Sequence, residues 1–324
     1  MMRRAVVIGT GHYLPSRVVP NSEFAARLDT SDEWIVSRSG IRRRHFAAED
    51  EFTSDLAIAA GRAALDNAQL AVGDIDCVVV ATSTPDYTFP AVATQVQAGL
   101  GMERGFAYDI QAVCAGFVFA LANANGIILS GQAERVLVIG AETFSRIIDP
   151  DDRSTAVLFG DGAGAVVLEA QDSTGEALDR GILSTDLHSD GRFRDLLYVD
   201  GGVSRSGKAG HLRMRGREVF RHAVEKLAAT AQAALARAGL SVADVDWIVP
   251  HQANLRIITG TAAKLGVGME RVVVTVQDHG NTSAASIPLA LSTAAAQQRF
   301  QPGDVILTEA IGGGLSWGAA VLRW

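Results

Sequence analysis

Continuous apolar runs alternate with helical patterns along this chain. Runs such as residues 78–80 and 136–139 lack polar alternation, which is typical of strands buried on both faces. The pattern predicts strands at residues 5–8, 77–81, 105–110, 135–139 and 163–168, and helices at 55–67, 91–99 and 115–130. Strands that alternate with helices of this length indicate an α/β fold with parallel sheet built from βαβ units.

The second half of the chain repeats this order. From about residue 181 the pattern predicts helices at 218–238, 257–265 and 284–299, and strands at 247–249, 272–276, 305–308 and 319–322. Gly101-Met102-Glu103-Arg104 recurs as Gly268-Met269-Glu270-Arg271, and Cys114 and Asn281 each lie 13 residues after the first glycine of their copy. We therefore expect two duplicated halves, residues 1–172 and 173–324. Two charged, glycine-containing insertions, at residues 29–54 and 189–216, interrupt the symmetry and are expected to carry binding function.

The composition is that of an ordinary globular protein. The chain has 324 residues, of which 48% are hydrophobic and 20% are charged. Its first apolar run ends at Gly9, too soon for a secretory signal, and no stretch has the length of a membrane-spanning helix. Two cysteines do not make a disulfide framework and match a reducing compartment. We therefore expect a cytoplasmic protein without a membrane partner.

The charge of the chain argues against nucleic acid as a partner and leaves an acidic partner open. A formal net charge of −7 argues against general nucleic-acid binding. One stretch runs against this trend with Arg205, Lys208, Arg213, Arg215, Arg217, Arg221 and Lys226. It is either a solvated face or a surface that attracts an acidic partner, and the sequence allows both.

Cys114 lies where a predicted strand ends and a helix begins. Free amides and the dipole of a helix start favour an anion, so we expect the pKa of this thiol to be lowered. The same amides can hold an oxyanion. The alternative is a buried, inert cysteine, the commoner state of a free thiol. Cys77 lies in mid-strand and is expected only to pack.

Two further polar residues occupy comparable positions. His251 directly follows the predicted strand 247–249, at the strand end where open α/β folds bind ligands. Asn281 is either a turn or helix-cap residue or a functional amide. His279, two residues before it, is expected to face elsewhere. The histidines and cysteines show no metal-ligand spacing, and the glycine pattern at residues 9–14 fails the dinucleotide fingerprint.

With these residues, the chain resembles the β-ketoacyl-acyl carrier protein synthase III family, which are condensing enzymes of the thiolase fold. Cys114 stands in Asp-Ile-Gln-Ala-Val-Cys-Ala-Gly-Phe, His251 in His-Gln-Ala-Asn-Leu-Arg and Asn281 in Gly-Asn-Thr-Ser-Ala. Further matching segments cover residues 30–42, 159–164 and 312–318. The resemblance spans essentially the whole chain. It implies a thiolase-like α/β fold in which two duplicated βαβ-type halves form a five-layered α-β-α-β-α sandwich.

The resemblance also implies a role for individual residues. The catalytic group would be Cys114, His251 and Asn281, with the amides of Cys114 and Gly313 as the oxyanion hole. The implied contacts to coenzyme A are Thr30, Trp34, Arg38, Arg153, Gly216 and Asn254; those to the acyl chain are Phe89, from a dimer partner, and Ile311; those to acyl carrier protein are Arg221, Arg256 and Lys264. No metal or other cofactor is implied. Many relatives carry Asn in place of Arg217 and Phe in place of Ile311, so the shape of the tunnel and acyl pocket is expected to differ.

The activity implied is the initiating condensation of type II fatty acid synthesis. An acyl group, expected to be acetyl, would pass from acyl-coenzyme A to Cys114 and condense with malonyl-acyl carrier protein as carbon dioxide leaves. Relatives that do not decarboxylate need a second base, and the glycine-rich turn at residues 312–318 carries no cysteine. Three alternatives stay open: a sister condensing enzyme of specialised metabolism, an inactive scaffold of the same fold, and a papain-like peptidase. The peptidase shares the Cys-His-Asn order but lacks the duplication.

Overall fold

The computed structural model describes residues 2–176 and 178–324. The strands are β1 Met2–Tyr13, β2 Arg17–Pro20, β3 Arg43–Phe46, β4 Cys77–Ala81, β5 Phe106–Ile110, β6 Arg135–Thr143, β7 Asp161–Ser173, β8 Gly181–Ser189, β9 Leu197–Val199, β10 Leu212–Met214, β11 Trp247–Ile248, β12 Val305–Gly312 and β13 Ser316–Arg323. The α-helices are α1 Asn21–Ala25, α2 Asp32–Ser39, α3 Thr53–Ala68, α4 Val92–Leu100, α5 Gly116–Leu129, α6 Arg153–Ala156, α7 Val203–Ser206, α8 Gly216–Arg237, α9 Leu255–Leu265, α10 Val276–His279 and α11 Ser286–Ala296.

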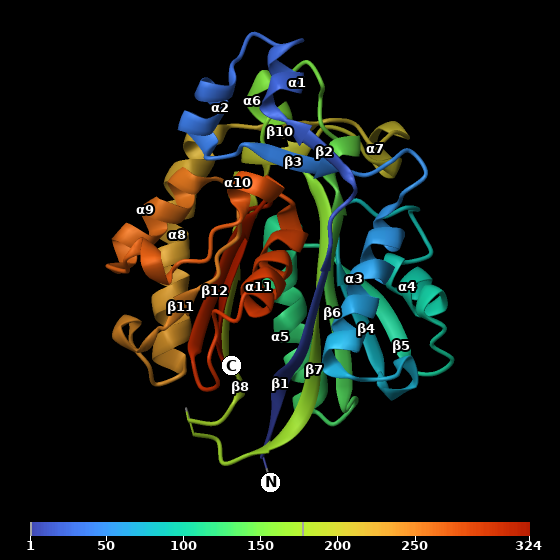
Figure 1. Cartoon of the computed structure of the whole chain (residues 1–324), viewed down its shortest axis with the longest axis vertical. Coiled ribbons are helices and arrows are strands. Elements are labelled where there is room, and N and C mark those ends of the chain that lie inside the picture. Colours follow the sequence, from blue (N-terminus) through green and yellow to red (C-terminus); the bar gives the residue numbers. More distant parts are fainter. Residues whose placement is uncertain (1, 177) are drawn as a thin grey trace.

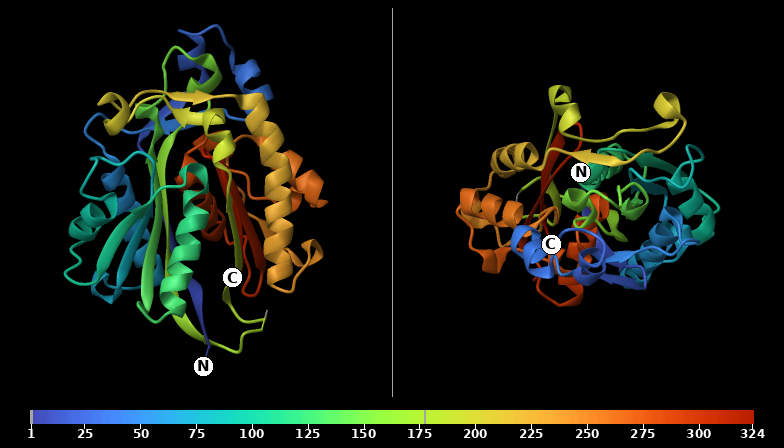
Figure 2. Two further views of the ribbon diagram at one scale, coloured as in Figure 1. Left: turned by 180° about the vertical axis from the view of Figure 1, so that it is seen from behind. Right: turned by 90° about the horizontal axis from the view of Figure 1, so that it is seen from above.

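Two sheets and three layers of helices make up the body of the molecule. One sheet has the strand order β1-β7-β6-β4-β5 and the other has the order β11-β12-β13-β8. Helices α5 and α11 lie between the sheets, α3 and α4 cover the first sheet, and α8 and α9 cover the second (Figure 1). The view from behind shows the same five layers, with α5 in the centre (Figure 2). The predicted five-layered arrangement is therefore present.

The sheets are mixed rather than parallel throughout. Strands β4, β5 and β6 are mutually parallel, as are β11 and β12, which agrees with the predicted βαβ units. The remaining pairs, including β6 with β7 and β12 with β13, are antiparallel. A few residues connect β12 to β13, and so short a link cannot make the crossover that parallel pairing needs.

The strand predicted at residues 272–276 is wrong over most of its length. Only Val272 bridges Ile248, and Val276 already belongs to α10. The Gln252 side chain supplies the missing partners: its Oε1 accepts from the amides of Thr275 at 2.8 Å and Val276 at 3.1 Å, and its Nε2 donates to the Val273 carbonyl at 3.0 Å. A buried amide thus satisfies backbone groups that a strand would have paired.

The central layer is closely packed against the first sheet. Helices α5 and α11 are apolar around most of their circumference, as expected for helices between two sheets. At Gly164 on β7, an added Cβ would lie 2.4 Å from the Leu289 backbone nitrogen of α11. At Gly140 on β6, it would lie 2.3 Å from the Ala284 carbonyl oxygen. Glycine is required at both positions because helix and strand backbones touch there.

The duplication is real, but the sequence spacing misplaces Cys114 against Asn281. Two 3-10 turns, Val113–Ala115 and Ser283–Ala285, begin with a residue of left-handed backbone, φ 50° and 49°, and lead into α5 and α11. The element equivalent to Cys114 is therefore Ala284, and Asn281 lies three residues earlier. The repeat spacing is lost because the second copy inserts α10 before its turn.

Both insertions lie at one end of the sandwich. Helix α2 and strand β3 come from the first insertion, and β9, α7 and β10 come from the second; together they form a cap over the strand ends (Figure 1). Strands of the first sheet end at Ser173 and those of the second begin at Gly181, while the domain boundary between residues 172 and 173 stays a prediction. No helix in the described part of the chain is long and apolar enough to cross a membrane.

Candidate active site

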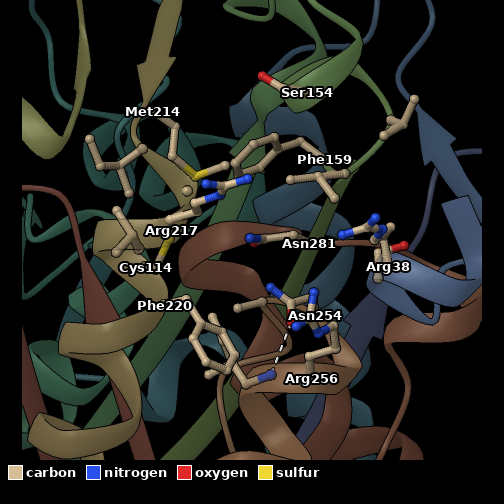
Figure 3. Close-up of a pocket in the computed structure, with 18 of the residues that line it drawn as sticks. Arg38, Cys114, Ser154, Phe159, Met214, Arg217, Phe220, Asn254, Arg256 and Asn281 are labelled. Atoms are coloured by element: carbon tan, nitrogen blue, oxygen red, sulfur yellow. Dashed lines mark hydrogen bonds between the residues drawn. The ribbon is translucent and has the colours of Figure 1, made fainter. Parts of the chain in front are cut away.

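A cavity of about 620 Å³ lies under the cap. Cys114, His251 and Asn281 all line it, so three residues from different parts of the sequence meet in one space, as predicted. Figure 3 shows Cys114 and Asn281 in this space, with Arg217 of α8 beside them. The outer walls come from the cap and from the starts of α8 and α9.

Cys114 occupies the 3-10 turn that precedes α5. The turn places the thiol at the cavity but leaves it only 3% exposed. Burial raises the pKa of this thiol to about 12; the Ser283 side chain opposes the rise, and the charge of Glu142 adds to it. The expectation that the helix start lowers the pKa of Cys114 is therefore wrong for this structure, in which desolvation outweighs the dipole.

His251 is held by its neighbours in one orientation. Its backbone amide donates to the Glu309 carbonyl of β12 at 2.9 Å, and its Nδ1 lies 2.7 Å from the Ser286 Oγ. Ser286 Oγ also accepts from the Gln252 amide at 3.2 Å. Burial lowers the pKa of His251 to about 3, so the ring is neutral at physiological pH.

Asn281 is fixed through its backbone and through one side-chain atom. Its amide donates to the Leu158 carbonyl at 2.9 Å, and its carbonyl accepts from Gly160 at 3.0 Å. Its Oδ1 accepts from the Ser283 amide at 2.9 Å. This bond settles the amide orientation, because it directs the Nδ2 hydrogens away from the turn and leaves them to donate.

Cationic and aromatic side chains form the outer part of the cavity. The guanidinium groups of Arg153 and Arg38 lie 5.3 Å and 5.9 Å from the centre of the Trp34 ring. Arg153 also donates to the Asp29 carboxylate at 3.1 Å. Asn254 caps α9 by accepting from the Ile257 amide at 3.0 Å (Figure 3). Such a rim suits a ligand with an aromatic ring and negative charge.

The structure places the remaining predicted residues in two groups. Gly216, Arg217, Arg256 and Ile311 line the cavity. Thr30, Phe89, Gly313, Arg221 and Lys264 are not among the residues that line it. Phe89 is 83% exposed. Within residues 2–176 and 178–324, no group of His, Cys, Asp or Glu is arranged to hold a metal ion.

Residue-by-residue reading of the sequence missed three side chains beside the predicted ones. Ser283 lies in a turn that packs against the turn of Cys114 and donates to Glu142, and Ser286 contacts His251. Ser283 and Ser286 stand only two and five residues after Asn281, so the polar run that begins there was an available signal. Glu142 had a weaker one, as a carboxylate three residues after the predicted strand 135–139.

Two family models match the chain. One, described as 3-oxoacyl-[acyl-carrier-protein (ACP)] synthase III, matches residues 108–191, and its C-terminal counterpart matches residues 235–324. The beta-ketoacyl-[acyl-carrier-protein] synthase III of Dinoroseobacter shibae is 74% identical, and that of Rhodobacter capsulatus is 72% identical, each over 100% of both chains. This chain belongs to the beta-ketoacyl-[acyl-carrier-protein] synthase III family.

Solved structures agree with this family assignment. The 3-oxoacyl-[acyl-carrier-protein] synthase III of Aquifex aeolicus superposes with a TM-score of 0.93 at 44% identity, over 99% of this chain and 100% of that one. The priming beta-ketosynthase of the R1128 polyketide pathway superposes with a TM-score of 0.92 at 38% identity, over 99% and 96%. The predicted family and the thiolase-like fold are confirmed.

Proposed function

We propose that this synthase III family member starts type II fatty acid synthesis. It transfers an acyl group from acyl-coenzyme A to Cys114 and condenses it with malonyl-acyl carrier protein, giving β-ketoacyl-acyl carrier protein, carbon dioxide and coenzyme A. The observation that carries this proposal is that Cys114, His251 and Asn281 line one cavity. The reaction uses no metal and no prosthetic group.

In the first half-reaction, the Cys114 thiolate attacks the thioester carbonyl and coenzyme A leaves. The Trp34 ring and the Arg153 guanidinium at the cavity rim are suited to the adenine and phosphates, with Arg38 and Thr30 nearby. Asn254 and Gly216 are assigned to the pantetheine arm. The amides of Cys114 and Gly313 are assigned to the carbonyl oxygen as its charge develops.

In the second half-reaction, loss of carbon dioxide places negative charge on the malonyl thioester oxygen. Ser286 Oγ accepts from the Gln252 amide, so its own hydrogen is directed to His251 Nδ1. His251 then carries its hydrogen on Nε2 and donates it to the enolate oxygen, together with Asn281 Nδ2. The resulting carbanion attacks the acyl group on Cys114.

Partner surfaces complete the proposal. We assign Arg221, Arg256 and Lys264, on α8 and α9, to contacts with an acidic acyl carrier protein. We assign Phe89 and Ile311 to the acyl pocket, with Phe89 reaching the pocket of a second copy. Exposure of Phe89 and the position of β5 at the edge of its sheet support a homodimer. We place this enzyme in the cytoplasm.

Intact mass after incubation with acetyl-coenzyme A tests the nucleophile. Wild-type protein should gain one acetyl group, and Cys114→Ser should gain none. Cys77→Ser is the matched control and should acylate normally, because Cys77 is buried at the start of β4 and does not line the cavity. Acetylation of Cys114→Ser at the wild-type rate would contradict the proposed function.

The second candidate function is the priming of a specialised metabolite with another starter. It is favoured by the likeness to the R1128 priming beta-ketosynthase and by Arg217 and Ile311, which line the cavity. A panel of straight, branched and aromatic acyl-coenzyme A donors, compared by acylation rate, separates the two. Preference for acetyl supports primary fatty acid synthesis.

A further inference from the structure

A buried arginine contacts the segment that holds Asn281. Arg44, in β3 of the first insertion, has no exposed surface. Its Nη1 donates to the Val19 carbonyl at 3.0 Å, its Nη2 donates to the Val157 carbonyl at 2.7 Å, and its guanidinium lies 4.8 Å from the centre of the Phe24 ring. Burial lowers the pKa of Arg44 to about 10, so the group stays charged at neutral pH and both hydrogen bonds are charge-assisted.

The bond to Val157 lies next to the backbone partners of Asn281. The amide of Asn281 donates to the Leu158 carbonyl at 2.9 Å, and the carbonyl of Asn281 accepts from the Gly160 amide at 3.0 Å. Val157 directly precedes Leu158 in the chain. Arg44 therefore fixes the carbonyl that comes immediately before the two groups that hold Asn281.

Arg44 also packs against glycines on both sides of this contact. A Cβ added at Gly160 would lie 2.9 Å from the Arg44 Cβ, and a Cβ added at Gly280 would lie 2.9 Å from the same atom. Gly280 directly precedes Asn281 and has a left-handed φ of 67°. A side chain at either glycine would collide with Arg44, so the backbone on both sides of the contact rests directly on this residue.

We propose that Arg44 is a positioning residue for Asn281 in the decarboxylation half-reaction. It holds the Val157 carbonyl and packs against the glycines at 160 and 280, so the backbone of Asn281 is confined and its Nδ2 donates at one place in the cavity. Arg44 is not among the residues that line the cavity, so it acts through Asn281 and not on the substrate. This role rests on the proposed function, in which Asn281 donates to the enolate oxygen.

The other two central residues are held by different elements. Cys114 occupies the turn before α5, and His251 is fixed by the Ser286 hydroxyl and by the backbone of β12. The hydrogen bonds of Arg44 go to β2 and to the residue after α6, and to none of these elements. Loss of Arg44 should therefore slow the step that uses Asn281 and spare the acylation of Cys114.

Arg44→Met removes both hydrogen bonds and keeps an unbranched side chain. Intact mass gives two single-turnover rates: acetylation of Cys114 by saturating acetyl-coenzyme A, and condensation of the acetyl-enzyme with malonyl-acyl carrier protein. Acetylation should stay within about twofold of wild type. Condensation should fall by about tenfold or more, up to the roughly 100-fold loss expected for Asn281→Ala, because a displaced donor costs no more than an absent one. Normal condensation, or an equal loss in both rates, would overturn the proposal.

A double variant separates positioning from general damage to the fold. If Arg44 acts through Asn281, adding Arg44→Met to Asn281→Ala should slow condensation by less than about twofold further. A further tenfold loss would show that Arg44 acts by another route. The single variant Asn281→Ala distinguishes the two claims: its normal condensation would contradict the proposed function and this inference with it, whereas slow condensation by Asn281→Ala beside normal condensation by Arg44→Met would refute the inference alone.

Arg44→Lys carries the test if Arg44→Met does not fold. Lysine keeps a donor but cannot bond both carbonyls with the fork of a guanidinium, so condensation should again be slowed with acetylation retained, and equal losses in both rates would count against the proposal. Val19→Ala is the matched control, because Val19 is 1% exposed in the same apolar cluster and its carbonyl stays available to Arg44. It should lower the stability measured in urea and change neither rate. A selective loss of condensation in Val19→Ala would assign the effect to loosening of the cap.

Discussion

Gly312, at the end of β12, is predicted to control the position of the nucleophile. A Cβ at this residue would lie 2.6 Å from the Cys114 backbone nitrogen and 3.0 Å from the Ala112 carbonyl oxygen. Ordinary contact begins at 3.4 Å, so in Gly312→Ala the turn must retreat by about 0.8 Å. The φ of Gly312 is not in the left-handed region, so alanine suits the backbone and the effect comes from the contact.

The size of the effect follows from this displacement. A misplacement of about 1 Å in a reacting group costs on the order of 100-fold in rate. We expect acylation of Gly312→Ala by acetyl-coenzyme A to slow by about that factor. Single-turnover mixing with intact-mass detection of the acyl-enzyme measures the rate. Strain against backbone atoms should also cost about 1–3 kcal/mol of unfolding free energy, measured in urea.

Gly126→Ala is the matched control. Gly126 lies in α5, the helix that begins after Cys114, and an added Cβ there meets nothing within 4 Å. This variant should acylate at the wild-type rate and gain about 0.5–1 kcal/mol of stability, the advantage of alanine in a helix. Wild-type acylation by Gly312→Ala, with unchanged stability, would refute the reasoning.

Three other outcomes are expected. Asn281→Ala should keep acylation but slow decarboxylation on the order of 100-fold, by loss of one donor to the enolate, as read by single-turnover mass spectrometry. Arg256→Glu, near the mouth of the cavity, should raise KM for malonyl-acyl carrier protein more than KM for acyl-coenzyme A; equal changes would contradict the assignment. Gln252→Leu leaves four backbone groups without their hydrogen-bond partner and should lower the free energy of unfolding, measured in urea, by at least about 3 kcal/mol. A decrease below about 1 kcal/mol would contradict this.

Local patterns predicted the alternating strands and helices of both halves and marked Cys114 and His251 as candidates, whereas Asn281 was singled out by the repeat match and the family resemblance. The runs at β4 and β6 are fully buried, and a strand buried on both faces has few other readings. Cys114 follows the partly exposed strand β5 and His251 follows the short strand β11, and the ends of parallel strands meet at one edge of a sheet. Cys77 is the first residue of β4 rather than a mid-strand residue, but its complete burial agrees with the predicted packing role.

Properties that depend on three-dimensional packing were not predicted. The Gln252 side chain makes the hydrogen bonds that a neighbouring strand would have made to residues 273–276. No local sequence pattern predicts that a side chain takes this role. The same extra residues that form α10 shifted the alignment of Cys114 with Asn281. Glu142 and Ser283 lie 141 positions apart, so their contact exists only after the two halves close on each other.

The thiol of Cys114 shows why the sign of a pKa shift needs burial as well as position. A helix start contributes about 0.3–1 kcal/mol and at most about 2 kcal/mol, which is no more than roughly 1.5 pKa units. Burial raises the pKa of Cys114 from 9.0 to about 12, a cost of about 4 kcal/mol, so desolvation wins. A dipole of this size cannot by itself supply a thiolate at neutral pH in this site. The contact with Ser283 lowers the pKa of Cys114 and the charge of Glu142 raises it, so these two neighbours do not reverse the effect of burial.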